Sequence, residues 1–266
     1  MGSTKPDPVY DRGMQAPRSI LITGASSGIG AALARAYAAP GVLLAISGRH
    51  AGRLAETGDA CRAVGADVRV SVLDVVDRPA VEDWIDAVNA VRPLDLVIAN
   101  AGISGGTAGD GEAAEQARAI FRTNVEGVLN TVHRAAEHMR GRGSGQIAII
   151  SSLASFRGYP GAPAYSGSKA AVRVYGEALR GALAPEGVGV SVVCPGYVRS
   201  PMTAANSFPM PMLMDAERAA RIIRRGLGKN RARIAFPWPV YAAAWMFGVL
   251  PPWIMDPVMA RLPKKG

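Results

Sequence analysis

Tyr165 and Lys169 stand four residues apart in a stretch that has the pattern of a helix. On a helix, side chains at this spacing lie on one face and within reach of each other. A tyrosine ordinarily holds its proton up to a pKa of about 10, and a neighbouring ammonium group favours the phenolate and lowers that pKa. The pair is therefore suited to exchange a proton with a substrate oxygen, although the same spacing also occurs in ordinary surface pairs.

Two serines precede this pair, at the end of a predicted strand. Ser151 and Ser152 follow the apolar run that starts at Gln146. Open α/β sheets bind their ligands at the carboxyl ends of their strands, and a hydroxyl placed there can donate a hydrogen bond to an oxygen that gains charge in the transition state. This context favours a catalytic role for the Tyr165–Lys169 pair.

A glycine-rich turn joins the first apolar run to the first helical pattern, with the sequence Thr23-Gly24-Ala25-Ser26-Ser27-Gly28-Ile29-Gly30. Glycines let the backbone approach a ligand closely, and the unpaired N–H groups at a helix start attract a pyrophosphate. Glycines also serve simply to make a tight turn, but the strand before and the helix after favour a dinucleotide site. We expect Gly24, Ser26, Ser27, Gly28, Ile29 and Gly30 to contact it.

The elements that must position these residues alternate along the chain. Six short apolar runs predict strands at Ser19–Thr23, Val42–Ser47, Val68–Leu73, Leu94–Ala99, Gln146–Ser151 and Val188–Cys194. Helical patterns lie between them at Ile29–Ala38, Arg53–Val64, Arg78–Val91, Gly111–Met139 and Ala164–Leu183. This alternation predicts an α/β fold, a doubly wound parallel sheet with helices on both faces.

The order of these motifs resembles the classical short-chain dehydrogenases/reductases over roughly residues 17–233. The shared features are the T-G-x-x-x-G-x-G turn, Asp74 after the third strand, Asn100-Ala101-Gly102 after the fourth, Asn124 in the long helix, and the serine with Tyr-x-x-x-Lys. Together they are far more specific than any one motif. The resemblance implies an oxidoreductase that moves hydride between a nicotinamide and a carbonyl or secondary alcohol.

The same resemblance implies a role for each matching residue. Tyr165 would be the acid/base, and a separation of 13 residues selects Ser152 as its partner. Lys169 would also hold the nicotinamide ribose. Asn124 would anchor a water that relays protons to Lys169, or would be only a helix-kink residue. The remaining implied cofactor contacts are Asp74 and Val75 at the adenine, Asn100, Ala101 and Gly102 along the cofactor, and Pro195, Gly196, Val198 and Ser200 beside the nicotinamide.

The end of the second strand bears on the choice of cofactor. An acidic residue there would hydrogen-bond the ribose 2′-hydroxyl of NAD, but the sequence reads Ser47-Gly48-Arg49-His50. The guanidinium of Arg49 would pair strongly with a 2′-phosphate. NADP(H) is therefore favoured, with NAD(H) as the alternative if Arg49 only stacks over the adenine.

Composition excludes several other classes of protein. The chain of 266 residues has a net charge of +9, yet no nucleic-acid module accompanies its basic residues, and we expect no nucleic-acid partner. Cys61 and Cys194 lack disulfide or metal spacing, so we expect two buried thiols and no metal. The first 18 residues do not have the apolar core of a secretory signal, so we expect a cytoplasmic protein. The late basic residues predict a solvated helix face: Arg218, Arg221, Arg224, Arg225, Lys229, Arg231 and Arg233.

The organisation predicted is a leader at 1–16, a catalytic domain at 17–234 and an apolar extension at 235–266. A Met- and Pro-rich segment from Pro201 to Met214 occupies the place of the family's substrate lid. It would either line a pocket for a lipophilic carbonyl or alcohol or pack on the protein itself.

The extension carries Trp238, Trp245 and Trp253, and its longest stretch without proline, Val240–Leu250, is too short to span a bilayer. It predicts a wall of the substrate pocket, a contact in a homodimer or homotetramer, or peripheral attachment to a membrane. A non-catalytic cofactor sensor and a membrane-anchored scaffold are the alternatives to an enzyme.

Overall fold

The computed structural model describes residues 14, 16–105, 112–206 and 208–261. Its centre is a seven-stranded sheet with the order β3-β2-β1-β4-β5-β6-β7, in which each neighbouring pair is parallel. The strands are β1 (Ser19–Ile22), β2 (Leu43–Gly48), β3 (Asp67–Val72), β4 (Leu96–Ala99), β5 (Gly145–Ile150), β6 (Val188–Pro195) and β7 (Arg233–Phe236). The predicted doubly wound fold is confirmed.

Each of the six apolar runs forms a strand, with ends shifted by one or two residues, and the sequence missed β7. This strand has only four residues and follows shortly after the basic helix, so its pattern is too short to recognise. Its pairing with β6 joins Cys194 to Ala235 and Pro195 to Phe236. The sheet therefore continues past the boundary that the sequence placed at residue 234.

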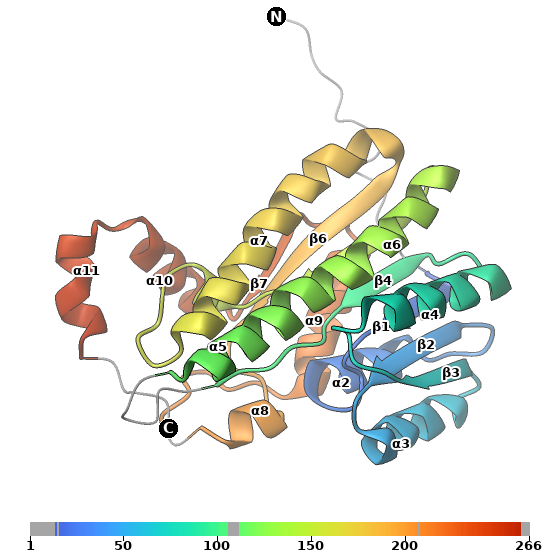
Figure 1. Ribbon diagram of the computed structural model, residues 1–266, viewed down its shortest axis with the longest axis horizontal. Helices are drawn as coiled ribbons and strands as arrows, with labels where there is room; N and C mark the ends of the chain where they lie inside the picture. Colours follow the sequence, from blue (N-terminus) through green and yellow to red (C-terminus); the bar gives the residue numbers. More distant parts are fainter. Residues whose placement is uncertain (1–13, 15, 106–111, 207, 262–266) are drawn as a thin grey trace, which may run out of the picture.

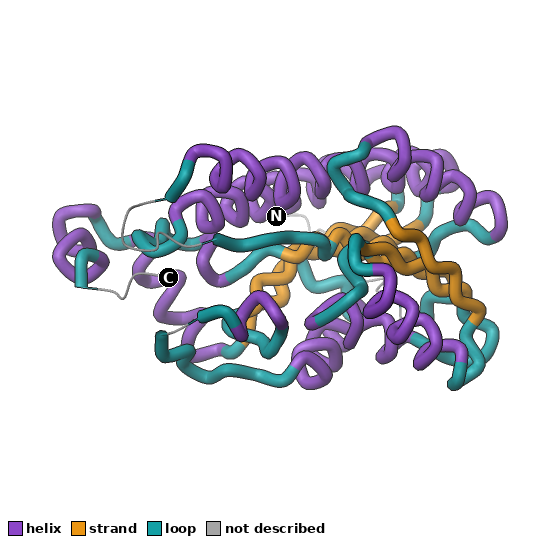
Figure 2. The backbone as a smooth tube through the Cα atoms, turned by 60° about the horizontal axis from the view of Figure 1, so that its bottom comes forward, coloured by secondary structure: helices purple, strands orange, loops and turns teal. Residues whose placement is uncertain are grey.

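Helices cover both faces of the sheet (Figure 1). One layer contains α2 (Gly28–Tyr37), α3 (Ala51–Arg62) and α9 (Ala216–Leu227); the other contains α4 (Arg78–Val91), α5 (Ala114–Phe121), α6 (Gly127–Arg142) and α7 (Pro163–Leu183). Figure 2 shows the two helical layers with the strands between them. The long helix expected from Gly111 begins at Ala114 among the described residues, Gly111 itself lying outside them, and a π-helical turn, η1 (Arg122–Glu126), divides it.

The two layers explain why the central strands read as continuous apolar runs. Every residue of β1, β2 and β4 is buried, because both faces of these strands are covered. The edge strand β3 has exposed residues among buried ones. The strand order reverses between β1 and β4, and this reversal opens a crevice at the carboxyl ends of the strands.

The basic helix α9 confirms the predicted solvated face, since Arg218, Arg221, Arg224 and Arg225 are exposed. Arg233 departs from that prediction. It lies in β7, and its guanidinium forms an ion pair with Glu177 of α7 at 2.5 Å. The predicted buried thiols are confirmed, because Cys61 and Cys194 are both free and buried.

The chain ends in two apolar helices, α10 (Trp238–Val249) and α11 (Pro252–Met259), which project from the edge of the molecule beside β7 (Figure 1). Val240, Tyr241 and Ala244 of α10 pack against a small core of Leu153, Val192 and Cys194. The described part of the chain contains no helix that is long and apolar enough to cross a membrane.

Candidate active site

The glycine-rich turn has the backbone that only glycine adopts easily. Gly24 and Gly28 have φ values of +68° and +54°, in the left-handed region. A Cβ at Gly24 would lie 2.7 Å from the Cα of Ala101, and one at Gly30 would lie 2.3 Å from the carbonyl oxygen of Gly24. The turn thus packs closely against the residues after β4.

Asn100 and Thr23 fix this turn with four hydrogen bonds. The Asn100 amide Nδ2 donates to the carbonyl oxygens of Thr23 and Gly24 at 2.9 and 3.0 Å. The Thr23 hydroxyl accepts from the backbone N–H groups of Asn100 and Ala101 at 3.0 and 3.1 Å. Helix α2 begins directly after the turn, and the side chain of its N-cap residue Ser27 makes no capping bond. The helix start therefore presents N–H groups without a side-chain acceptor.

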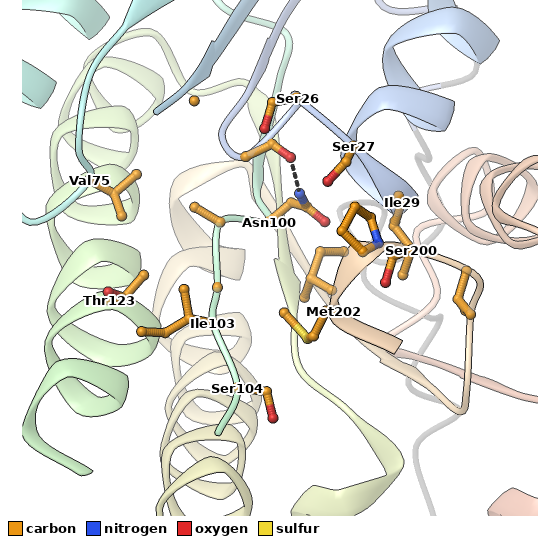
Figure 3. A pocket seen from close by; sticks show the side chains of 18 of the residues that line it. Ser26, Ser27, Ile29, Val75, Asn100, Ile103, Ser104, Thr123, Ser200 and Met202 are labelled. Carbon is orange, nitrogen blue, oxygen red and sulfur yellow. Dashed lines mark hydrogen bonds between the residues drawn. The ribbon is translucent and has the colours of Figure 1, made fainter. Parts of the chain in front are cut away.

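A cavity of about 390 Å³ runs from this helix start across the crevice. Figure 3 shows Ser26 and Ser27 at one end and Ser104 at the other, with Val75 and Thr123 opposite Ile29 and Ser200. It is lined by the predicted residues Gly24, Ser26, Ser27, Gly28, Ile29, Arg49, Asp74, Val75, Asn100, Ala101, Gly102, Ser152, Tyr165, Lys169, Pro195, Gly196, Val198 and Ser200. Gly30 and Asn124 stand outside this lining and support it from behind.

The end of the cavity beside β2 is rich in basic side chains. The Arg49 guanidinium lies 3.6 Å from the carboxylate of Asp74, and both side chains are about half exposed. His50 and Arg53 line the same end, and the sequence argument missed them. Their position at the start of the helix after β2 is the signal that could have found them, because that helix start faces the same end of the crevice as Arg49.

The catalytic candidates meet where the cavity reaches β5. The Ser152 hydroxyl forms a hydrogen bond with the Tyr165 phenol and accepts one from the backbone N–H of Ala154 at 3.1 Å. The Lys169 ammonium lies 5.9 Å from the centre of the Tyr165 ring and donates to the carbonyl oxygen of Ile150 at 2.9 Å. Helix α7 and the end of β5 therefore bring together the three residues that the sequence selected.

Burial controls the proton affinity of this group. Lys169 is only 4% exposed, and burial lowers the pKa of its ammonium to about 8. Burial raises the pKa of Tyr165, while its hydrogen bond with Ser152 lowers it. Without a bound cofactor, withdrawal of the phenol from water outweighs the other influences, and the net pKa of Tyr165 is raised.

Asn124 lies on the π-helical turn, and its side chain is fully buried. Its amide oxygen accepts from the N–H of Ile103 at 2.8 Å, and its amide nitrogen donates to the carbonyl of Ile103 and to Ser168 at 2.9 and 3.0 Å. A Cβ at Gly102 would lie 3.1 Å from Asn124 Oδ1 and 3.3 Å from Lys169 Nζ. Asn124 therefore fixes the segment after β4 beside Lys169.

Ser200 lies at the cavity wall but its hydroxyl already has a structural partner. It caps the short helix α8 (Pro201–Ala204) by accepting from the N–H of Thr203 at 3.3 Å, and Thr203 Oγ1 accepts from the Ser200 N–H at 2.9 Å. A Cβ at Gly28 would lie 2.9 Å from the Ser200 Cβ. The capping box thus holds the α8 turn against the glycine-rich loop.

A second cavity of about 320 Å³ adjoins the first. Ser104, Ser152, Tyr165, Gly196, Met202 and Thr203 line both. Its other walls are mostly apolar, and they include Phe208 and Pro211 of the predicted lid, with Val240, Ala243, Ala244 and Phe247 of α10 and Met259 of α11.

The Met-rich segment divides between the two roles predicted for it. Met202 lines both cavities. Met214 is buried and bridges to Val198, whereas Met212 is exposed.

The first cavity fits a nicotinamide dinucleotide. Its glycine cradle leaves no room for a Cβ at Gly24 or Gly28, a helix start faces it, and hydroxyl and basic side chains line its length. These are the donors that a pyrophosphate and two riboses require. Gly24, Ser26, Ser27 and Gly28 would hold the pyrophosphate, and Lys169 and Tyr165 would face the nicotinamide end.

Comparisons with known proteins agree with this geometry. The short chain dehydrogenase family matches residues 18–209. A protein of Myxococcus xanthus described as an uncharacterized oxidoreductase is 39% identical over 246 residues, covering 92% of this chain and 97% of the relative.

Two solved structures share the fold and carry nicotinamide cofactors. A short chain dehydrogenase/reductase from Burkholderia phymatum in complex with NAD has a TM-score of 0.79 at 25% identity, covering 95% of this chain and 98% of its own. A structure from Beutenbergia cavernae is described as a putative NAD(P)-dependent gluconate 5-dehydrogenase with bound NADP. It has a TM-score of 0.73 at 26% identity, and the match covers 86% of this chain and 96% of its own. The chain belongs to the short-chain dehydrogenase/reductase family and is an oxidoreductase with a nicotinamide cofactor.

Proposed function

We propose that the protein is an NADP(H)-preferring oxidoreductase that interconverts a lipophilic carbonyl compound and its secondary alcohol, with Tyr165 as the acid/base. One observation carries this proposal: Ser152 and Tyr165 line both cavities. Their hydroxyls are hydrogen-bonded to each other between a site suited to a dinucleotide and a separate apolar chamber. A carbonyl oxygen held by these two hydroxyls would place its carbon at the boundary between the chambers.

The residues of the chain divide the reaction among them. Ser152 donates a hydrogen bond to the substrate oxygen and stabilises the charge that grows on it. Tyr165 delivers the proton to that oxygen in reduction and removes it in oxidation. Lys169, held by the Ile150 carbonyl, keeps a cation beside Tyr165. When bound, the nicotinamide supplies or accepts the hydride, and its oxidised form adds a positive charge that favours the phenolate.

The preference for NADP(H) rests on the basic end of the first cavity. Arg49, His50 and Arg53 lie there together, and a guanidinium pairs strongly with a phosphate. The weak 3.6 Å pair of Arg49 with Asp74 leaves Arg49 available to a 2′-phosphate. NAD(H) is the alternative cofactor, and relatives of the same fold bind either one.

The lipophilic character of the substrate rests on the second cavity. Its apolar walls come from the lid segment and from α10 and α11, so these two helices of the extension serve as a substrate wall on their inner side. Burial of an apolar chain there would contribute about 25 cal/mol for each Å² removed from water. We propose a single catalytic domain that includes β7, followed by this wall.

A carbonyl panel tests the function. Purified protein would be mixed with NADPH and a set of lipophilic ketones and aldehydes, and the loss of absorbance at 340 nm would be followed. Tyr165→Phe is the matched variant, because its ring still packs while its proton donor is lost. We expect kcat to fall by about 10²–10⁴-fold with nearly unchanged NADPH binding. A variant within about tenfold of wild type would overturn the assignment, and a wild type that binds NADPH but turns over no carbonyl or alcohol would favour a cofactor sensor or scaffold.

A further inference from the structure

The second cavity has a charged side chain, Arg157, in its lining. Among the described residues that line this chamber, Arg157 alone carries a formal charge at neutral pH. Its side chain is 23% exposed. It lies between the short helix η2 (Leu153–Ser155), which follows Ser152, and helix α7, which carries Tyr165. A cation therefore stands in an otherwise uncharged and mostly apolar wall, close in sequence to Ser152.

The protein's own partners for this guanidinium are weak. Its Nη1 donates to the carbonyl oxygen of Leu250 at 3.2 Å. Its Nη2 lies 3.6 Å from the carboxylate of Asp256, whose side chain is 73% exposed. An ion pair of that length with an exposed carboxylate contributes little to stability. A guanidinium has five N–H donors, so these two contacts use a minority of them.

A largely buried cation in a mostly apolar wall is unfavourable unless it is paired and hydrogen-bonded. The exposed Asp256 offsets only part of this desolvation. A carboxylate entering with the substrate would meet a planar guanidinium whose geometry matches its own two oxygens. The chamber therefore combines an apolar wall on α10 with one site for an anion.

We propose that the second cavity takes an amphipathic oxo acid or hydroxy acid, whose apolar chain lies against α10 and whose carboxylate pairs with Arg157. This inference rests on the proposed function and names its substrate class. Arg157 acts as a specificity determinant, while Ser152 and Tyr165 act on the carbonyl. The exposed carboxylate of Asp256 competes weakly with the substrate for the same guanidinium.

A structural role for Arg157 predicts different behaviour. If its only purpose were to hold the link between α10 and α11 through Leu250 and Asp256, loss of either charged partner would loosen the wall. The kcat/KM values for acids and for neutral substrates would then fall by similar factors. Arg157→Met and Asp256→Asn separate the two roles, because Asp256→Asn removes the competing charge and keeps the guanidinium.

The test uses a series of oxo fatty acids in which the ketone moves stepwise away from the carboxylate, each compared with its own methyl ester. We expect wild type to prefer at least one acid over its ester in kcat/KM. Arg157→Met should reduce that preference by about tenfold to hundredfold, the range for a hydrogen bond to a charged group, while turnover of the ester changes little. Asp256→Asn should keep or increase the preference, mainly through KM.

Calorimetry supplies a readout that does not depend on turnover. Decanoate and decanol would be titrated into the full chain with NADP⁺ present, for wild type, Arg157→Met and Asp256→Asn. We expect decanoate to lose affinity in Arg157→Met only, and decanol to bind all three alike. Equal use of acids and esters by wild type, or equal effects of both variants on both ligand types, would overturn the inference. Absence of turnover with every oxo compound would instead refute the proposed function, and the decanoate titration would still decide the role of Arg157.

Discussion

The pKa of Lys169 offers a quantitative test of how far the candidate active site excludes water. Lys169→Met replaces its ammonium with an apolar side chain of similar reach. Burial lowers the Lys169 pKa from 10.5 to about 8, and a difference of this size corresponds to about 3 kcal/mol of free energy. Below pH 8 the folded protein therefore holds a charged lysine that is less stable in its buried site than in the unfolded chain.

The sign of the pH dependence follows from proton binding. In the unfolded chain Lys169 loses its proton near pH 10.5, and in the folded protein it does so near pH 8. Between these values the unfolded state binds more protons, so the destabilisation is relieved as the pH rises. From pH 7 to pH 9 this linkage stabilises wild type by about 1.4 kcal/mol. Lys169→Met lacks this ionisation, so its free energy of unfolding relative to wild type should fall by the same amount.

Urea denaturation followed by far-ultraviolet circular dichroism measures this difference. Both proteins would be unfolded at pH 7, 8 and 9, at one protein concentration and without cofactor. Other titrating groups cancel in the comparison. Lys229→Met is the matched control, because Lys229 is exposed, and its difference from wild type should not depend on pH. A Lys169→Met difference that is the same at pH 7 and pH 9 would refute the reasoning, since it would mean that the ammonium is not held in a dry site.

Two further predictions concern the ends of the molecule. Arg49→Ala should raise the Kd for NADPH by about tenfold or more and change the Kd for NADH little, measured by fluorescence titration; equal losses would mean that Arg49 only stacks. Trp238, Trp245 and Trp253 are 73%, 51% and 76% exposed, so the full chain should float with anionic liposomes at low salt. Replacing all three tryptophans with serine should abolish flotation. The residues that line the second cavity stay unchanged in this variant. Absence of flotation by wild type would exclude peripheral attachment and leave the outer side of α10 and α11 to a subunit contact.

Features that depend on short spacings could be predicted from the sequence. The buried strands appeared as apolar runs because two helical layers cover both of their faces. The Tyr165 and Lys169 spacing placed both side chains on one helical face. The glycine turn was identifiable because φ values such as those of Gly24 and Gly28 favour glycine. Each of these signals lies within one element or at one junction.

Other features depend on segments that are distant in sequence, and only the tertiary structure decided them. β7 is defined by pairing with β6 rather than by its own four residues. The raised pKa of Tyr165 depends on how completely its surroundings exclude water, which no spacing of charges reveals.

The second cavity also combines features that the sequence predicts with features that only the tertiary structure decides. The apolar composition of the extension was evident, but only the structure shows that residues of α10 line the same cavity as Ser152 and Tyr165. Arg157 had no distinguishing motif, and its contact with Leu250 joins residues 93 positions apart. The sequence by itself determined the family and the fold and selected the candidate catalytic residues, because local patterns encode them. The tertiary structure decided what surrounds Ser152 and Tyr165, because burial and charge isolation arise only when distant segments pack together.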